Sequence, residues 1–227
     1  MCLKCEKWYF LIKKKLEINI NFLLYLTNRS VCGGVLLILD TKSLIVEIAT
    51  KLFQQKGYIG VGLNEILKAC NISKGSLYHH FPNGKEELLI ACLQTVNEAI
   101  TMDIEEIFKK YPTTKEAIKA MIDKLIHNFE TEGSIVAYTM SSMVSEMSSF
   151  SDSVKEECAQ LYTKIHDIYF NKLLQDGFSK DTAYSVALLM TASIEGGNML
   201  CLTKKTSEPL REISKTLPKF IDCSKNE

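Results

Sequence analysis

Residues 73–85 of this chain, SKGSLYHHFPNGK, hold several hydrogen-bonding side chains at close spacing. Lys74 and His79 contribute ammonium and ring nitrogens, and Ser76 and Tyr78 contribute hydroxyl groups. These groups suit phosphate oxygens and the edges of nucleic-acid bases. The chain shows no nucleophile with a matching base and acid. The pattern therefore favours binding to a polyanion over catalysis, and we predict no catalytic residues.

The sequence around this stretch predicts two short helices joined by a turn. Residues 63–69 have the apolar spacing of about two helical turns, and Asn71 tolerates the left-handed conformation that closes a helix. Ser73 can cap a second helix over residues 74–80, which Pro82 stops. Two such helices form the helix-turn-helix pattern, which places its second helix in the major groove of DNA.

The second helix has an apolar face, made by Leu77 and Phe81, that can contact a core. The residues that point away from this face are Lys74, Gly75, Ser76, Tyr78 and His79. A lone His-His pair is more often an ordinary surface feature, but on this helix we expect His79 to contact DNA. Two alternatives stay open for His80, which can join the same face or turn inward and bond to the backbone.

Flanking helices complete the predicted module. Apolar residues between Leu44 and Phe53 form one stripe of a helix that Asp40 or Thr41 can cap and that Gly57 ends. After the second short helix, N-G-K-E begins another helix, with Asn83 as the expected cap and Glu86 at the capping-box position. At this helix start, Lys85 is expected to hold a DNA phosphate.

Composition predicts an all-α protein, because glycine (11) and proline (4) are scarce in 227 residues and helix-forming residues dominate. The charge sums to zero but is divided along the chain. Residues 41–85 hold six lysines and two acidic residues, whereas residues 86–227 hold 15 basic and 22 acidic residues. A basic module on an acidic body is typical of polyanion binders, although the same charge occurs in proteins that never bind nucleic acid.

The eight cysteines lie in a chain without a recognisable signal peptide, so we expect reduced thiols and a cytoplasmic protein. Cys2 and Cys5 form a C-x-x-C without a second pair, and we predict no metal site and no cofactor. The longest uncharged run near the N-terminus, residues 18–28, is shorter than the roughly 20 residues of a membrane span. We favour the interpretation that residues 1–39 are an extra segment outside the native protein, which would then begin near Asp40.

The rest of the chain predicts a helical body. An unbroken helical pattern over residues 87–110 links it to the DNA module. Thr113 with Glu116 forms a capping box for a helix over residues 113–129, Ser153 with Glu156 begins one over residues 153–176, and a further pattern covers residues 181–203. The last of these is apolar on more than one face and needs partners on several sides. With the helix 153–176 it could form a four-helix seam between two subunits, where Gly196-Gly197 would permit close approach.

A stripe of methionines could line a pocket for a small molecule. The candidate effector-binding residues are Phe129, Tyr138, Met140, Met143 and Met147. Plain core packing is the alternative explanation of this stripe, and for methionines at helical spacing it is the commoner one.

Over residues 41–90 the sequence resembles the TetR family of one-component transcriptional regulators, through LFQQKGY, LNEILKACNISKGSLYHHF and the lysine that follows. The junction FPNGKEE, together with SIEGGNML, is similar to the LmrA/YxaF-like branch, which represses multidrug efflux and related genes. The resemblance implies operator contacts by Ser76, Tyr78, His79, His80 and Lys85, with Lys74 and Gly75 at the start of the recognition helix. It also implies a homodimer whose helical body binds a small effector.

Two departures from the family pattern are visible. Gly62-Leu63 replaces the usual threonine pair, which puts a phosphate contact there in doubt, and the junction after Phe81 is one residue longer than usual. We predict a helix-turn-helix domain over residues 40–86 and an effector-binding and dimerisation domain over residues 87–227. The expected function is a repressor of a palindromic operator, released by an apolar or aromatic effector. The alternatives are an activator and a DNA-binding protein without an effector.

Overall fold

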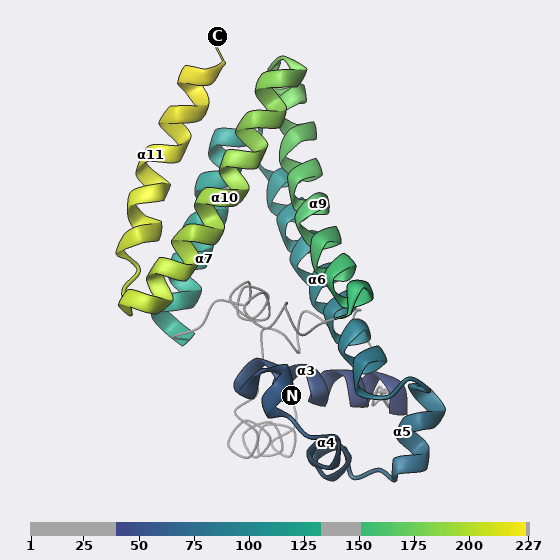
Figure 1. The fold of residues 1–227 in the computed structure, drawn as a ribbon. Coiled ribbons are helices and arrows are strands. Elements are labelled where there is room, and N and C mark those ends of the chain that lie inside the picture. The colour runs from purple at the N-terminus through teal and green to yellow at the C-terminus, as the bar shows by residue number, and fades with distance from the viewer. Residues whose placement is uncertain (1–39, 133–150, 226–227) are drawn as a thin grey trace, which may run out of the picture. The chain divides into compact units, whose positions relative to one another are not determined.

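The computed structural model describes residues 40–132 and 151–225, and within these ranges every regular element is an α-helix, which confirms the all-α prediction. The first three helices are α3 (Thr41–Gly60), α4 (Leu63–Cys70) and α5 (Lys74–His80). The others are α6 (Lys85–Lys110), α7 (Thr114–Glu132), α9 (Asp152–Gln175), α10 (Lys180–Lys204) and α11 (Glu208–Ser224) (Figure 1).

The boundaries of the first helices follow the local signals in the sequence. The Asp40 carboxylate accepts a hydrogen bond from the Ser43 N–H at 2.9 Å, which caps α3. Gly57 breaks α3 with φ 72° and ψ 164°, and Asn71 ends α4 in the left-handed conformation. Ser73 caps α5 by accepting from the Ser76 N–H at 3.1 Å. These cap predictions are confirmed.

A compact apolar cluster holds α3, α4, α5 and the first turns of α6 together. Its fully or nearly fully buried members are Ile45, Ala49, Phe53, Ile66, Leu77, Phe81, Leu88 and Leu89. Because Leu77 and Phe81 are both buried here, the remaining residues of α5 must lie toward the surface. The apolar face predicted for α5 is confirmed.

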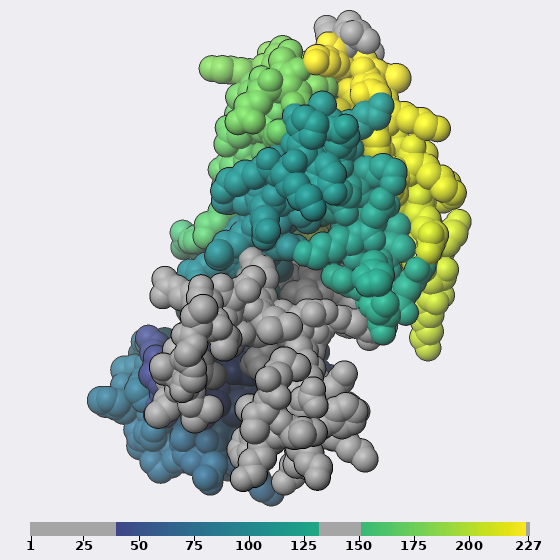
Figure 2. Space-filling model, turned by 180° about the vertical axis from the view of Figure 1, so that it is seen from behind, coloured from purple at the N-terminus to yellow at the C-terminus, as the bar shows by residue number. Residues whose placement is uncertain are grey.

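In the body, α6 packs against α9, and α11 packs against both α7 and α10. Figure 2 shows α7 and α11 side by side on the surface seen from behind. Thr113 and Glu116 form the predicted capping box, since each backbone N–H donates to the other side chain at 3.3 Å. The domain boundary after residue 86 stays a prediction, because α6 runs through it from Lys85 to Lys110.

The start of α9 differs from the sequence-based expectation. The predicted cap Ser153 is wrong, because α9 begins at Asp152 and Ser151 accepts from the Val154 N–H at 3.4 Å. The Ser151 hydroxyl also donates to the Glu86 carboxylate at 2.6 Å. This bond to α6, which no local pattern reveals, adds a tertiary contact at the earlier serine.

Candidate DNA-binding surface

Helix α5 presents one polar face to solvent. Lys74, Gly75, Tyr78 and His79 are exposed, and Ser76 and His80 are partly exposed. The predicted side chains are therefore together on one short helix, which is anchored from behind by buried Leu77. This surface offers hydroxyl, imidazole and ammonium groups within two helical turns, which are the donors that bind phosphate oxygens and base edges.

The ring of Tyr78 is positioned by neighbours on two sides. Gly84 has φ 72°, and a Cβ atom built there would lie 3.4 Å from Tyr78 Cε1 and 3.6 Å from its hydroxyl oxygen. The Lys74 ammonium lies 5.8 Å from the centroid of the same ring. With 40% of the side chain exposed, Tyr78 can still offer its hydroxyl to a partner. Because Gly84 has no side chain, the ring of Tyr78 can lie directly against it.

The two histidines of α5 differ in their surroundings. Their rings meet edge to face with centroids 5.0 Å apart, and His79 is the more exposed of the two. The Ser43 N–H is the main cause that lowers the pKa of Asp40, and a positive charge on His80 acts in the same direction. His80 therefore lies near the start of α3, whereas His79 points away from the protein.

The ammonium group of Lys85 is held against Tyr58. Its Nζ donates to the Tyr58 carbonyl oxygen at 2.5 Å and lies 4.0 Å from the centroid of the Tyr58 ring. Burial raises the pKa of the Tyr58 hydroxyl, and the nearby Glu86 carboxylate adds to that effect. Lys85 thus ties the start of α6 to the turn after the Gly57 break. A phosphate contact by this lysine stays a prediction.

The predicted cap of α6 is wrong by one residue. Gly84 is the N-cap residue and has no side chain to supply a cap, while the Asn83 N–H donates to the Glu87 carboxylate at 2.8 Å. Glu87, and not Glu86, therefore reaches back over the helix start. The shift follows from Gly84, whose φ of 72° and ψ of −136° only glycine adopts readily.

Comparison with known proteins agrees with this geometry. Residues 45–92 match the model of bacterial regulatory proteins of the TetR family, and residues 114–216 match the C-terminal domain of LmrA/YxaF-like transcriptional regulators. The chain is 36% identical over 182 residues to the HTH-type transcriptional regulator LmrA of Bacillus subtilis. The aligned region covers 80% of this chain and 97% of the Bacillus subtilis protein. The chain belongs to the TetR family, in its LmrA/YxaF-like branch. Proteins of the TetR family are DNA-binding transcriptional regulators and not enzymes.

Two further relatives extend the comparison of this TetR-family regulator. The biofilm operon negative regulator IcaR of Staphylococcus aureus is 40% identical over 65 residues, which are 27% of this chain and 35% of that one. The reduced form of Escherichia coli NemR has a TM-score of 0.69 at 22% identity and covers 78% of this chain and 95% of that one. At that identity the structural match supports the fold alone.

One basic residue close to α5 was not among the predicted DNA contacts. Lys42, in the first turn of α3, is exposed, and its ammonium lies 5.7 Å from the centroid of the Phe81 ring at the end of α5. The positive charge of residues 41–85 is the sequence signal that could have pointed to it. At the other departure from the family pattern, Gly62 is the N-cap of α4 and has no side-chain hydrogen bond there.

Most of the predicted effector site lies outside the described residues. Tyr138, Met140, Met143 and Met147 fall in residues 133–150, which the structure does not describe. Phe129, near the end of α7, is half-buried and packs against the core. Within the two described ranges no group of three or more His, Cys, Asp or Glu side chains could hold a metal ion.

Proposed function

We propose that this TetR-family regulator binds a palindromic operator as a homodimer, represses transcription and leaves the operator when a small effector binds its body. The observation that carries the operator-binding step is the exposed face of α5, where Lys74, Tyr78 and His79 stand in front of the buried Leu77. Ser76, His80, Gly75 and Lys85 complete the proposed contact set. One such helix touches only a few base pairs, so two-fold symmetry is needed for tight operator binding.

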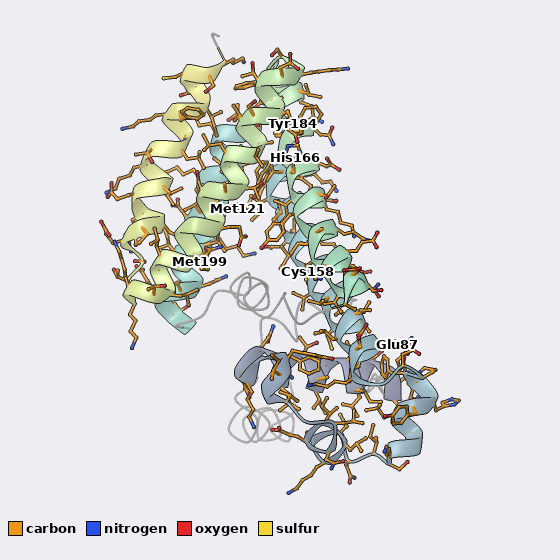
Figure 3. The ribbon with its side chains drawn as sticks, viewed as in Figure 1. Glu87, Met121, Cys158, His166, Tyr184 and Met199 are labelled. Atoms are coloured by element: carbon orange, nitrogen blue, oxygen red, sulfur yellow. The ribbon has the colours of Figure 1, made fainter. Side chains whose placement is uncertain are left out.

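The homodimer is supported by an apolar face on α10. Its exposed large apolar residues are Tyr184, Leu188, Leu189, Met199 and Leu200. On α9, the helix expected to share the seam, Leu161, Ile165 and Tyr169 are buried within the subunit. We therefore assign Tyr162 and His166, which are partly exposed, to the α9 side of the seam. The ring centroid of His166 lies 4.7 Å from that of Tyr184 on α10 (Figure 3). An apolar face of this kind is typical of a protein interface.

The two adjacent glycines of α10, Gly196 and Gly197, have different surroundings. A Cβ atom on Gly197 would lie 2.6 Å from Ile213 Cδ1 and 2.9 Å from Leu210 Cδ2, so this glycine allows α10 to pack closely on α11. Gly196 is exposed, and a Cβ atom there would have no heavy atom within 4 Å. We therefore propose that a second subunit can approach α10 closely at Gly196 and not at Gly197.

Repression and effector release are supported by the relatives and by the acidic body. IcaR is named a negative regulator, and repression is what the family resemblance implies. A body of this size attached to a small DNA module suits a sensor. Helix α10 is long and apolar enough to cross a membrane, but its buried side packs on α9 and α11. We therefore propose a cytoplasmic regulator that does not use a membrane.

The test is a titration of the full chain against DNA from its own promoter region, at two salt concentrations and with random DNA as competitor. Saturable binding of a dimer to one sequence is the expected result, and His79→Ala and Tyr78→Phe should weaken it while the dimer stays intact. Salt-sensitive binding without sequence preference would contradict operator recognition. If the protein is an activator, deletion of its own gene should reduce transcription from the promoter that it binds.

A further inference from the structure

Lys42 is an exposed lysine whose position its own helix does not explain. It lies in the first turn of α3, where the positive end of the helix dipole disfavours a cation. The neighbouring Asp40 carboxylate accepts from the Ser43 N–H at 2.9 Å and from the Ser43 hydroxyl at 3.2 Å. Among residues 40–132 and 151–225, no carboxylate lies within ion-pair distance of the Lys42 ammonium. Lys42 therefore carries a positive charge that α3 does not need for its stability.

Three of the six lysines in residues 41–85 are engaged within the protein. Two of them form ion pairs on or next to α3, namely Lys51 with Glu47 and Lys56 with Glu65. The ammonium of Lys85, for which the family resemblance implies an operator contact, donates to the Tyr58 carbonyl oxygen at 2.5 Å. The lysines that form no ion pair within the described part of the chain are Lys42, Lys68 and Lys74. The free positive charge of the module is thus concentrated on three side chains.

Two of these three lysines lie at opposite ends of α5. Lys74 is the first residue of the helix, and Phe81 directly follows its last residue. The Lys42 ammonium lies 5.7 Å from the centroid of the Phe81 ring, so the start of α3 and the end of α5 are side by side (Figure 1). The polar face of α5 is therefore bounded by an exposed ammonium group at each end.

The length of α5 is close to the width of the groove in which a recognition helix lies. Its seven residues rise by about 10 Å, and the major groove of B-DNA is about 12 Å wide. Phosphate groups line both walls of that groove. When the polar face of α5 lies in the groove, side chains at the two ends of the helix come close to the walls. An ammonium group at each end can then neutralise a phosphate on each side.

We propose that Lys42 binds a DNA phosphate from outside the helix-turn-helix, and that Lys42 and Lys74 together hold α5 between the two walls of the major groove. A phosphate contact carries no sequence information, so Lys42 adds affinity for any DNA and leaves the preference for the operator to the other residues of α5. The proposal rests on the proposed function in taking α5 as the helix that enters the groove.

The test is the salt dependence of DNA binding by the full chain, measured by fluorescence anisotropy with promoter DNA and with a random duplex of the same length. Each phosphate contact contributes about 0.9 to the slope of log K against log salt, so Lys42→Ala should reduce the slope of a dimer by about 1.8. From about 50 to about 200 mM salt, the affinity of wild type should then fall about 12-fold more than that of the variant. The ratio of promoter to random affinity should stay unchanged, because no base contact is lost.

Lys51→Ala is the matched control, because Lys51 lies on the same helix and its Nζ is 2.5 Å from the Glu47 carboxylate. This variant removes the same charge and should keep the wild-type slope, as should Lys42→Arg, which preserves the charge. Lys42→Ala should melt no lower than wild type, because it removes a cation from the positive end of a helix dipole. If it melts lower than Lys51→Ala, Lys42 serves the fold and the proposal is overturned. An equal loss of slope in both alanine variants would also overturn it.

The two DNA molecules separate this proposal from the proposed function. If wild type prefers promoter DNA and Lys42→Ala keeps the full slope, operator recognition stands and the phosphate contact is wrong. If Lys42→Ala loses slope but wild type binds both duplexes equally, the contact stands and operator recognition fails. A weaker promoter preference at an unchanged slope would mean that Lys42 acts on sequence reading, which overturns the proposal. If wild type binds neither duplex, both fail.

Discussion

Replacement of Gly84 by alanine tests how α5, the proposed recognition helix, is aligned. Gly84 has φ 72° and ψ −136°, a conformation that costs about 1–3 kcal/mol for a residue with a side chain. The new Cβ atom would also lie 3.4 Å from Tyr78 Cε1, at the near limit of van der Waals contact, so a relaxation of the strained backbone there displaces the tyrosine ring as well. We expect Gly84→Ala to lower the melting temperature by about 2–4 °C for each kcal/mol.

Operator affinity should fall as well. A displaced Tyr78 hydroxyl loses a hydrogen bond worth about 0.5–1.5 kcal/mol in each subunit, and the two subunits together predict a loss of about 5- to 150-fold. Fluorescence anisotropy with the operator measures this loss. Gly62→Ala is the control, because Gly62 has φ −81° and a Cβ atom there would have no heavy atom within 4 Å.

A double-mutant cycle decides whether the loss comes through the tyrosine. In a Tyr78→Ala background, Gly84→Ala should still lower the melting temperature but should have almost no further effect on operator affinity. An undiminished second loss would refute the positioning role of Gly84. If Tyr78→Ala alone leaves operator binding unchanged, the assignment of Tyr78 as a DNA contact is wrong instead.

Four further variants address charge, pH and packing. Lys85→Ala should reduce the slope of log K against log salt by about one for each lost phosphate contact, and an unchanged slope would show that Lys85 only ties α6 to the turn after Gly57. Because the pKa of Asp40 is lowered in the folded state, its carboxylate cap stabilises the fold above the unfolded pKa, and this contribution is lost as pH falls through the folded pKa. In Asp40→Asn the melting temperature should therefore fall less than in wild type as the pH is lowered below about 4. Gly197→Ala should destabilise each subunit by about 1–3 kcal/mol, while Gly196→Ala should leave the subunit intact and weaken self-association measured by ultracentrifugation.

Local chemistry explains why the DNA module could be predicted closely. Asp40, Asn71 and Ser73 act as helix caps in the structure as expected, because each cap is local: the Asp40 and Ser73 side chains accept from an N–H three residues on, and Asn71 adopts the left-handed conformation. The polar face of α5 follows from the period of the helix once Leu77 is assigned to the core. Recognition of the family rested on the same contiguous residues and is confirmed.

Two errors in the body arose where contacts from distant residues decided between similar local alternatives. Ser151 and Ser153 are both possible caps, and the Glu86 carboxylate from α6 bonds to Ser151. Gly197 looked like a contact between subunits, but α11 lies against it. Neither outcome depends on residues near in sequence, so no local pattern could show it.

The sequence alone determined that this protein is helical, that it carries a helix-turn-helix and that it belongs among TetR-like regulators, because helix periods, caps and motifs act over a few residues. Only the tertiary structure decided that Gly84 makes room for Tyr78, that Lys85 is held by Tyr58, and that Lys42 lies beside Phe81. These facts depend on which helices pack together in three dimensions. Packing is set by the whole set of apolar contacts, and it assigns neighbours that the order of residues does not reveal.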